Sequence, residues 1–175
     1  TVFVSGGSLG ARGINLGIEV ALPALKENGV QVIWQTGSPF YRQALEAVAG
    51  IGYTDCKVHE FVARMDHAYA VADLVVARAG AISVSELQLV QLPAILVPLP
   101  TAAEDHQTMN ARALTDLGAA VLVKDADAIR TLGGEILRLL HDPGELVRLR
   151  TAIAGLGHQN AAEAIAAEVI RLARA

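Results

Sequence analysis

Near its N-terminus the chain reads VFVSGGSLGAR (residues 2–12), a short apolar run followed by a glycine-rich loop. The residues after this loop carry apolar side chains at helical spacing, with Ile14, Ile18, Leu22 and Leu25 on one face. A buried strand that passes through a tight glycine turn into a helix is the first half of a βαβ unit. The stretch therefore predicts an α/β fold that opens with a strand of a parallel sheet.

The same alternation of strand and helix patterns continues along the chain. The strand-like runs are residues 2–4, 31–35, 57–60, 74–77, 94–97 and 120–123. This alternation predicts a Rossmann-like parallel sheet with right-handed crossovers and helices on both faces. From residue 127 onward the pattern is almost entirely helical, and we expect these helices to pack on the sheet. The last of them, residues 160–175, carries Ile165, Val169 and Leu172 on one stripe.

The composition excludes several classes of protein. Hydrophobic residues make up 53% of the 175 residues, yet there is no run of about 20 apolar residues that could span a membrane. Continuous apolar strands of a sheet covered on both faces explain this content. The net charge is -4 and no basic cluster is present, so nucleic acid is not expected as a partner. The single cysteine, Cys56, excludes an internal disulfide and a cysteine-based zinc site.

The glycine loop is compatible with more than one function. As a dinucleotide fingerprint it is incomplete, because Ser8 occupies the place of the second glycine and no acidic residue ends the strand at residues 31–35. The run from Gly6 to Gly10 matches a nucleophile elbow, but no strand precedes it to supply an oxyanion hole. Contact with a phosphate or sugar, and close packing of strand on helix, both stay open.

A second loop follows the strand at residues 74–77. Arg78 ends this strand, Gly80 permits a turn, and Ser83 lies in the first turn of the next helix. An anion there would meet free backbone N–H groups. Glu86 lies three residues after Ser83, which is the spacing of a capping box. Alternatively, Glu86 could accept hydrogen bonds from a ribose diol.

The turn after the fifth strand is rich in hydrogen-bonding side chains. Gln107 and Asn110 share a helix face through their i, i+3 spacing, and amides suit sugar hydroxyls because they both donate and accept. A capped, solvated first helical turn is the alternative interpretation. Glu104, Asp105 and His106 are metal-binding residue types, but no second cluster completes a coordination shell.

Taken together, the three loops resemble the C-terminal domain of the MurG family, which transfers GlcNAc from UDP-GlcNAc to the lipid-linked muramoyl-pentapeptide of peptidoglycan synthesis. The resemblance extends over essentially all 175 residues. It rests on the motifs Gly6-Gly7-Ser8-x-Gly10-Ala11, His59-Glu60-Phe61-Val62, Arg78-x-Gly80-Ala81-x-Ser83-x-Ser85-Glu86 and Asp105-His106-Gln107-Thr108-x-Asn110-Ala111. It implies one UDP-GlcNAc-binding domain over residues 1–175, the donor half of a GT-B glycosyltransferase, with the N-terminal acceptor domain absent from this chain.

The resemblance also implies a role for each loop. The turn at Phe61 and Val62 would read the uracil, chiefly through the backbone of Val62, and Glu86 would bind the ribose hydroxyls. Arg78 would support its loop or the phosphates. The diphosphate and the near edge of the sugar would be held by Ser8 and by the segment Ala81, Ile82 and Ser83, with Gly7 as a supporting residue. The GlcNAc hydroxyls would contact Gln107, with His106 and Asn110 nearby.

By the same resemblance, this domain supplies no catalytic residue, no metal ligand and no cofactor. Helix N-termini would stabilise the departing UDP, and the motif Asp125-Ala126-Asp127 is interpreted as a helix N-cap. The expected partners are UDP-GlcNAc, the protein's own N-terminal domain and, through it, the lipid-linked acceptor. The expected location is cytoplasmic, with the full-length protein peripheral on the cytoplasmic face of the inner membrane.

Three alternatives stay open. The chain could be a separate donor-binding subunit of a two-chain GlcNAc transferase. It could also belong to a UDP-sugar epimerase or be an NAD-binding Rossmann domain.

Ser83 departs mildly from the family, in which Thr is common at this position, and keeps the hydroxyl.

Overall fold

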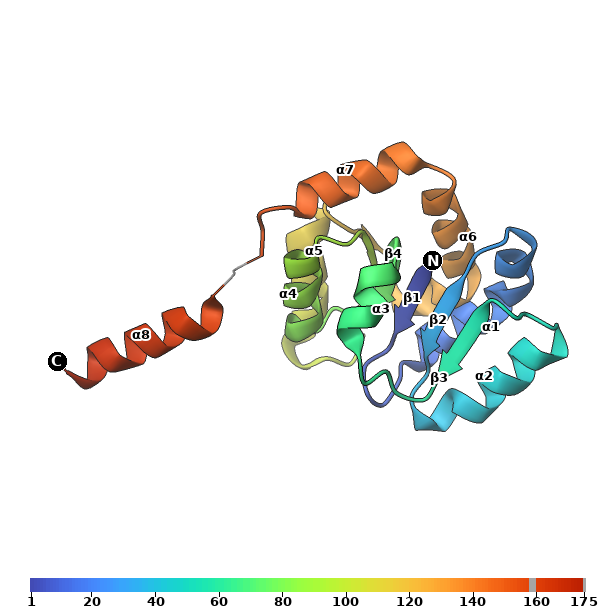
Figure 1. Cartoon of the computed structure of the whole chain (residues 1–175), viewed down its shortest axis with the longest axis horizontal. Coiled ribbons are helices and arrows are strands. Elements are labelled where there is room, and N and C mark those ends of the chain that lie inside the picture. The colour runs from blue at the N-terminus through green and yellow to red at the C-terminus, as the bar shows by residue number, and fades with distance from the viewer. Residues whose placement is uncertain (158–159, 175) are drawn as a thin grey trace.

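The computed structural model describes residues 1–157 and 160–174 and shows a six-stranded sheet (Figure 1). Its strands are β1 (Val2–Ser5), β2 (Val32–Gln35), β3 (Cys56–His59), β4 (Leu74–Ala77), β5 (Ala94–Leu96) and β6 (Val121–Leu122). All neighbouring strands are parallel, in the order β3-β2-β1-β4-β5-β6. The predicted Rossmann-like sheet is therefore confirmed, with strand ends within about two residues of the expected ones.

Helices connect the strands and cover both faces of the sheet. The α-helices of the described chain are α1 (Arg12–Glu27), α2 (Ser38–Gly50), α3 (Met65–Val71), α4 (Ala81–Val90), α5 (His106–Thr115), α6 (Ala128–Leu140), α7 (Pro143–Ile153) and α8 (Ala161–Ala173), of which α1 to α6 supply the two helical layers. Short 3-10 helices at Ala103–Asp105 and Asp125–Asp127 precede α5 and α6.

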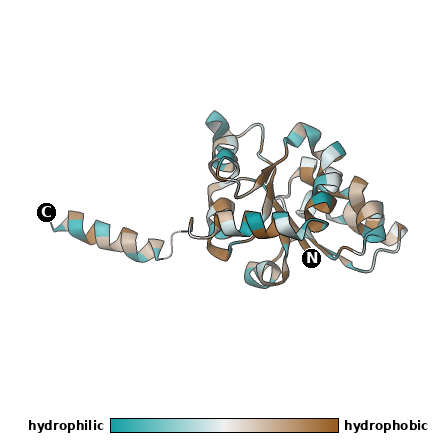
Figure 2. Ribbon diagram, turned by 90° about the horizontal axis from the view of Figure 1, so that it is seen from above, coloured by the Kyte–Doolittle hydropathy of each residue, from teal (hydrophilic) through white to brown (hydrophobic). Residues whose placement is uncertain are grey.

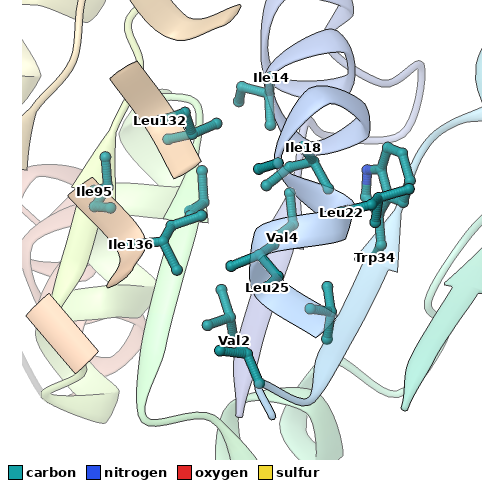
Figure 3. Packing of buried hydrophobic residues seen from close by; sticks show 14 of the residues in the cluster. Val2, Val4, Ile14, Ile18, Leu22, Leu25, Trp34, Ile95, Leu132 and Ile136 are labelled. Atoms are coloured by element: carbon teal, nitrogen blue, oxygen red, sulfur yellow. The ribbon is translucent and has the colours of Figure 1, made fainter. Parts of the chain in front are cut away.

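The core has two parts because successive strand side chains point to opposite faces. In β1, Val2 and Val4 pack with α1, α2 and α6, whereas Phe3 packs with α3, α4 and α5. Figure 3 shows the first of these layers, in which Ile14 and Ile18 of α1 face the sheet. Each fully buried side chain of this kind contributes about 1.5–3 kcal/mol of transfer free energy. The expected helical layer on each face is present.

Helix α1 lies very close to helix α6. A Cβ atom on Gly17 would lie 2.7 Å from the carbonyl oxygen of Ala128, and one on Gly133 would lie 2.6 Å from the Cβ of Ala21. The two helices therefore approach through small residues, and any larger side chain would push them apart.

The final helix departs from the prediction. Helix α8 lies apart from the rest of the chain in two perpendicular views (Figures 1 and 2). Its predicted stripe is exposed, with Ile165, Val169 and Leu172 at 66%, 60% and 60%. The two faces of the sheet pack against α1 to α6, and α8 has no buried residue. Helices α6 and α7 do pack on the body, through residues such as Leu139 and Leu149.

The order of the strands indicates where a ligand could bind. From β1 the chain builds one half of the sheet through β2 and β3, and from β4 it builds the other half through β5 and β6, so the strand order reverses between the neighbours β1 and β4. In folds of this order, ligands bind outside the carboxyl ends of the strands at this switch point.

Within residues 1–157 and 160–174, no helix is both long and apolar enough to cross a bilayer.

Candidate functional site

A cleft of about 480 Å³ lies at the switch point, beyond the carboxyl ends of β1 and β4. Its lining includes residues from all three loops that the sequence singled out, namely Gly7, Arg78, Ser83 and Gln107. A neighbouring cavity of about 540 Å³, bounded by residues such as Arg112 and Leu122, contains none of the predicted site residues. The switch-point cleft is therefore the candidate site.

The glycine loop between β1 and α1 needs its glycines for backbone geometry. Gly10 has a φ of +76°, and a Cβ there would lie 2.0 Å from the carbonyl oxygen of Thr36. The Gly10 N–H donates to the carbonyl of Gly7, which closes the turn. The residue before α1, Ala11, gives no side-chain cap. The first N–H groups of α1 thus keep the capacity to bind an anion.

Gln35 joins this loop to the turn that contains Val62. The Gln35 side chain is 2% exposed; its Nε2 donates to the Gly7 carbonyl at 3.0 Å and to Ser5 Oγ at 3.3 Å. Its Oε1 accepts from the Val62 N–H at 2.8 Å. The Val62 N–H is therefore already engaged by a side chain of β2. Sequence reasoning missed this residue, and its place at the end of β2 was the available signal.

Helix α4 begins at Ala81, whereas a capping box would need Ser83 at the N-cap position, just before the first helical residue. Gly80 is the N-cap residue, so Ser83 lies inside the first turn and caps nothing. The carboxylate of Glu86 accepts a hydrogen bond from the Tyr69 hydroxyl at 2.9 Å. The capping-box interpretation is wrong for this pair, because the helix begins two residues before Ser83. Glu86 is instead oriented by a side chain from α3.

The ring of Tyr69 is positioned by a contact with the sheet. Its ring packs edge-on against Phe3, with ring centres 5.6 Å apart and an interplanar angle of 81°. Burial, and secondarily the hydrogen bond to Glu86 and that residue's negative charge, raise the pKa of Tyr69 above its ordinary value. The hydroxyl therefore keeps its proton and acts as a donor to Glu86 at neutral pH.

The side chain of Arg78, just after β4, forms hydrogen bonds with residues that follow β5 and β6. Its Nη1 donates to the carbonyls of Val97 and Pro98, each at 3.1 Å, and to Oδ1 of Asp125 at 2.6 Å. The two charged side chains are only 12% and 23% exposed. Asp125 was expected to cap a helix, and this was wrong, because its carboxylate pairs with Arg78 instead. Asp127 does take the N-cap position of α6, but its side chain makes no capping bond.

The third loop uses its amides to fix the backbone. Oε1 of Gln107 accepts from the Leu99 N–H at 2.9 Å, and Nδ2 of Asn110 donates to the Ala79 carbonyl at 3.0 Å. Asp105 stands at the N-cap of α5, but its carboxylate accepts from the Thr108 hydroxyl at 2.6 Å. The simple capped-turn interpretation therefore does not describe this segment. In each of these two amides, one polar atom forms a hydrogen bond with the backbone of the protein.

The remaining predicted residues surround the cleft without lining it. Ser8, Ala81 and Ile82 are sequence neighbours of lining residues, and the Ile82 side chain is 77% exposed. Glu86 lies one helical turn beyond Ser83. Phe61, Val62, His106 and Asn110 lie on flanking loops or helices outside the lining. The cleft lining thus combines two of the phosphate-binding candidates, Gly7 and Ser83, with the sugar-reading candidate Gln107, whereas the base-reading and ribose-reading candidates lie outside it.

Comparison with known proteins gives one family. Residues 1–165 match the family described as the glycosyltransferase family 28 C-terminal domain. The chain is 48% identical over 171 residues to the UDP-N-acetylglucosamine--N-acetylmuramyl-(pentapeptide) pyrophosphoryl-undecaprenol N-acetylglucosamine transferase of Porphyromonas gingivalis, covering 98% of this chain and 45% of that protein. It is 47% identical over 177 residues to the enzyme of the same name from Bacteroides thetaiotaomicron, covering 100% of this chain and 48% of that protein. The chain therefore spans about half the length of these relatives.

Solved structures agree with this match. MurG from Acinetobacter baumannii superposes with a TM-score of 0.82 at 28% identity, over 98% of this chain and 49% of that one. A UDP-N-acetylglucosamine 2-epimerase has a TM-score of 0.60 at 15% identity, over 86% of this chain and 37% of that one, which is a likeness of fold alone. Because the family match covers nearly the whole sequence, and the fold agrees with it, the chain belongs to the glycosyltransferase family 28 C-terminal domain family.

Proposed function

We propose that this chain is the donor-binding domain of an inverting N-acetylglucosaminyltransferase, which binds UDP-GlcNAc for transfer to the lipid-linked muramoyl-pentapeptide of peptidoglycan synthesis. The observation that carries the proposal is the convergence of three loops on one cleft at the switch point. The names of relatives at 47% and 48% identity support the choice of donor and acceptor.

In this proposal the diphosphate lies against the N-termini of α1 and α4. Ser8 and residues 81–83 offer it backbone N–H groups and hydroxyls, in the positive ends of two helix dipoles. Glu86 accepts from the ribose hydroxyls with the carboxylate that Tyr69 orients. The uracil lies at Phe61 and Val62. The GlcNAc hydroxyls contact Gln107, with His106 and Asn110 beside it.

The chemistry follows from the leaving group. An acceptor hydroxyl attacks the anomeric carbon, the bond from that carbon to the β-phosphate oxygen breaks, and its electron pair leaves with UDP. The two helix N-termini stabilise the charge that develops on the diphosphate. The acceptor's proton goes to a base that this chain does not provide. We propose that this base, the acceptor site and the membrane-facing surface on the cytoplasmic side belong to a domain outside residues 1–175.

Calorimetric titration with UDP-GlcNAc, UDP-glucose and NADH, without added metal, tests the donor assignment. We expect heat from both uridine ligands, tighter binding of UDP-GlcNAc and no signal from NADH. Binding of NADH without binding of the uridine ligands would return the glycine loop to a dinucleotide function. Transfer of GlcNAc to a lipid-linked acceptor by the 175-residue chain alone would contradict the placement of the base outside it.

A further inference from the structure

Arg12 is a cation in the switch-point cleft that no function has been assigned to. It is the first residue of α1 and lines the cleft beside Gly10 and Gly13. Its side chain is exposed and has no hydrogen bond or ion pair among the described residues. By contrast, Arg64, Arg130, Arg138, Arg148 and Arg171 each pair with a carboxylate on the surface.

The charges that line the cleft do not cancel. They belong to Arg12, Arg78 and Asp125. Arg78 and Asp125 form an ion pair at 2.6 Å, and two carbonyls accept from the same nitrogen of Arg78. This pair is neutral as a whole, so Arg12 leaves the cleft with one positive charge. The chain as a whole carries -4, which makes this local positive charge stand out against its surroundings.

The position of Arg12 is also unfavourable for the free protein. The N-terminus of a helix carries a partial positive charge, and a cation there is destabilising. The first turn of α1 has no acidic side chain of its own. The carboxylate of Asp125 lies beside Gly13, but it is already paired with Arg78. A residue that conflicts with a local rule of stability commonly marks a functional site. A bound anion would remove the conflict, because it would face the guanidinium and the helix N-terminus together.

We propose that Arg12 binds the diphosphate of the nucleotide donor directly through its positive charge. Arg78 is not available for this contact because it is paired with Asp125. The inference rests on the proposed function and deepens it, because it names the side chain that recognises the leaving group. The planar guanidinium of arginine can donate two parallel hydrogen bonds to phosphate oxygens. Uridine without phosphates would not reach this contact.

The test compares uridine with UDP by calorimetry on the 175-residue chain and three variants. Arg12→Gln removes the charge, Arg12→Lys keeps a point charge without the fork, and Arg42→Gln removes an equally exposed charge from α2, outside the cleft. We expect Arg12→Gln to raise the Kd of UDP about 10-fold to 100-fold and leave the Kd of uridine unchanged. Arg12→Lys should fall between wild type and Arg12→Gln, and Arg42→Gln should match wild type.

Two further readouts separate binding from a structural role. Added salt should weaken UDP binding more steeply in wild type than in Arg12→Gln, because the lost contact is a screened ionic one. The melting temperature of Arg12→Gln without ligand should equal or exceed that of wild type, since the unfavourable cation has gone. A lowered melting temperature together with weaker uridine binding would overturn the inference in favour of a structural role.

The outcomes also separate this inference from the proposed function. If wild type binds UDP and Arg12→Gln binds it equally well, Arg12 does not contact the diphosphate and the donor-binding function stands. If wild type binds neither uridine nor UDP, the proposed function fails and the inference fails with it.

Discussion

The hydroxyl of Tyr69 donates a hydrogen bond to Oε2 of Glu86 across 2.9 Å, and so joins α3 to α4 beside the candidate site. The Tyr69 ring rests edge-on against Phe3 of β1, which connects this bond to the core of the sheet. The other carboxylate oxygen of Glu86 has no hydrogen bond within the described part of the chain. Glu86 is thus held by one oxygen, and the proposed function assigns the other to the ribose hydroxyls.

We expect Glu86→Ala to weaken UDP binding by about 1.5–3 kcal/mol, the range for a lost hydrogen bond to a charged group. This corresponds to an increase in Kd of about 10-fold to 150-fold. Calorimetry measures it, and Glu46→Ala, an exposed glutamate of α2, is the matched control. Equal affinities for wild type and Glu86→Ala would show that Glu86 does not bind the ribose.

Tyr69→Phe keeps the ring on Phe3 and removes only the hydroxyl. We expect it to lower the free energy of unfolding by about 1 kcal/mol, because one hydrogen bond is lost. It should also raise the Kd of UDP by less than Glu86→Ala does, since Glu86 is then present but less well oriented. In a double-mutant cycle the effects of Tyr69→Phe and Glu86→Ala on UDP binding should not add. Additive effects would mean that Tyr69 does not act through Glu86.

The ion pair of Arg78 and Asp125 should be important for stability. Removing one partner leaves the other charge largely buried, which costs up to about 3–5 kcal/mol in well-buried pairs. We expect Arg78→Leu to lower the free energy of urea-induced unfolding by about 2–4 kcal/mol, somewhat less than in well-buried pairs because both side chains are partly exposed. The double variant Arg78→Leu with Asp125→Leu should recover part of the loss. Arg130→Ala, which breaks an exposed pair, should change little.

The buried Cys56 should make stability depend on alkaline pH. Burial raises the pKa of its thiol from 9.0 to about 12, with a small opposing effect of Lys57. Since the unfolded thiol ionises first, its contribution to stability is complete below pH 9 and is lost as pH rises towards 12. Tyr53 and Tyr69 have raised pKa values and act in the same direction. The free energy of unfolding of Cys56→Ala should therefore fall less steeply between pH 9 and 11 than that of wild type, and an identical slope would contradict the assignment.

The sheet could be predicted from sequence because a buried parallel strand has a local signature. The run at Leu74–Ala77 is entirely apolar and matches β4 residue for residue. Helix α8 shows the limit of this reasoning. Its stripe of Ile165, Val169 and Leu172 reveals an apolar face, but sequence periodicity does not say which surface covers that face.

The site could be predicted at the level of loops but not of side-chain pairs. Loops at the carboxyl ends of parallel strands lie along the same edge of the sheet, so the three motifs could be placed on one side of the sheet in advance. The bonds from Gln35 to Val62 and from Arg78 to Asp125 span 27 and 47 residues. No local pattern specifies such partners. The capping-box interpretation of Ser83 and Glu86 was wrong for a related reason, because spacing alone does not fix where a helix begins.

The central claim is that UDP lies in the switch-point cleft against the N-termini of α1 and α4. The most direct measurement is a titration of the isotope-labelled chain with UDP, followed through backbone amide NMR shifts. We predict the largest shifts at the amides of Gly7, Gly10 and residues 81–83, with little change in α7. Saturable shifts centred on the neighbouring cavity at Arg112 and Leu122, with the glycine loop unmoved, would contradict the claim.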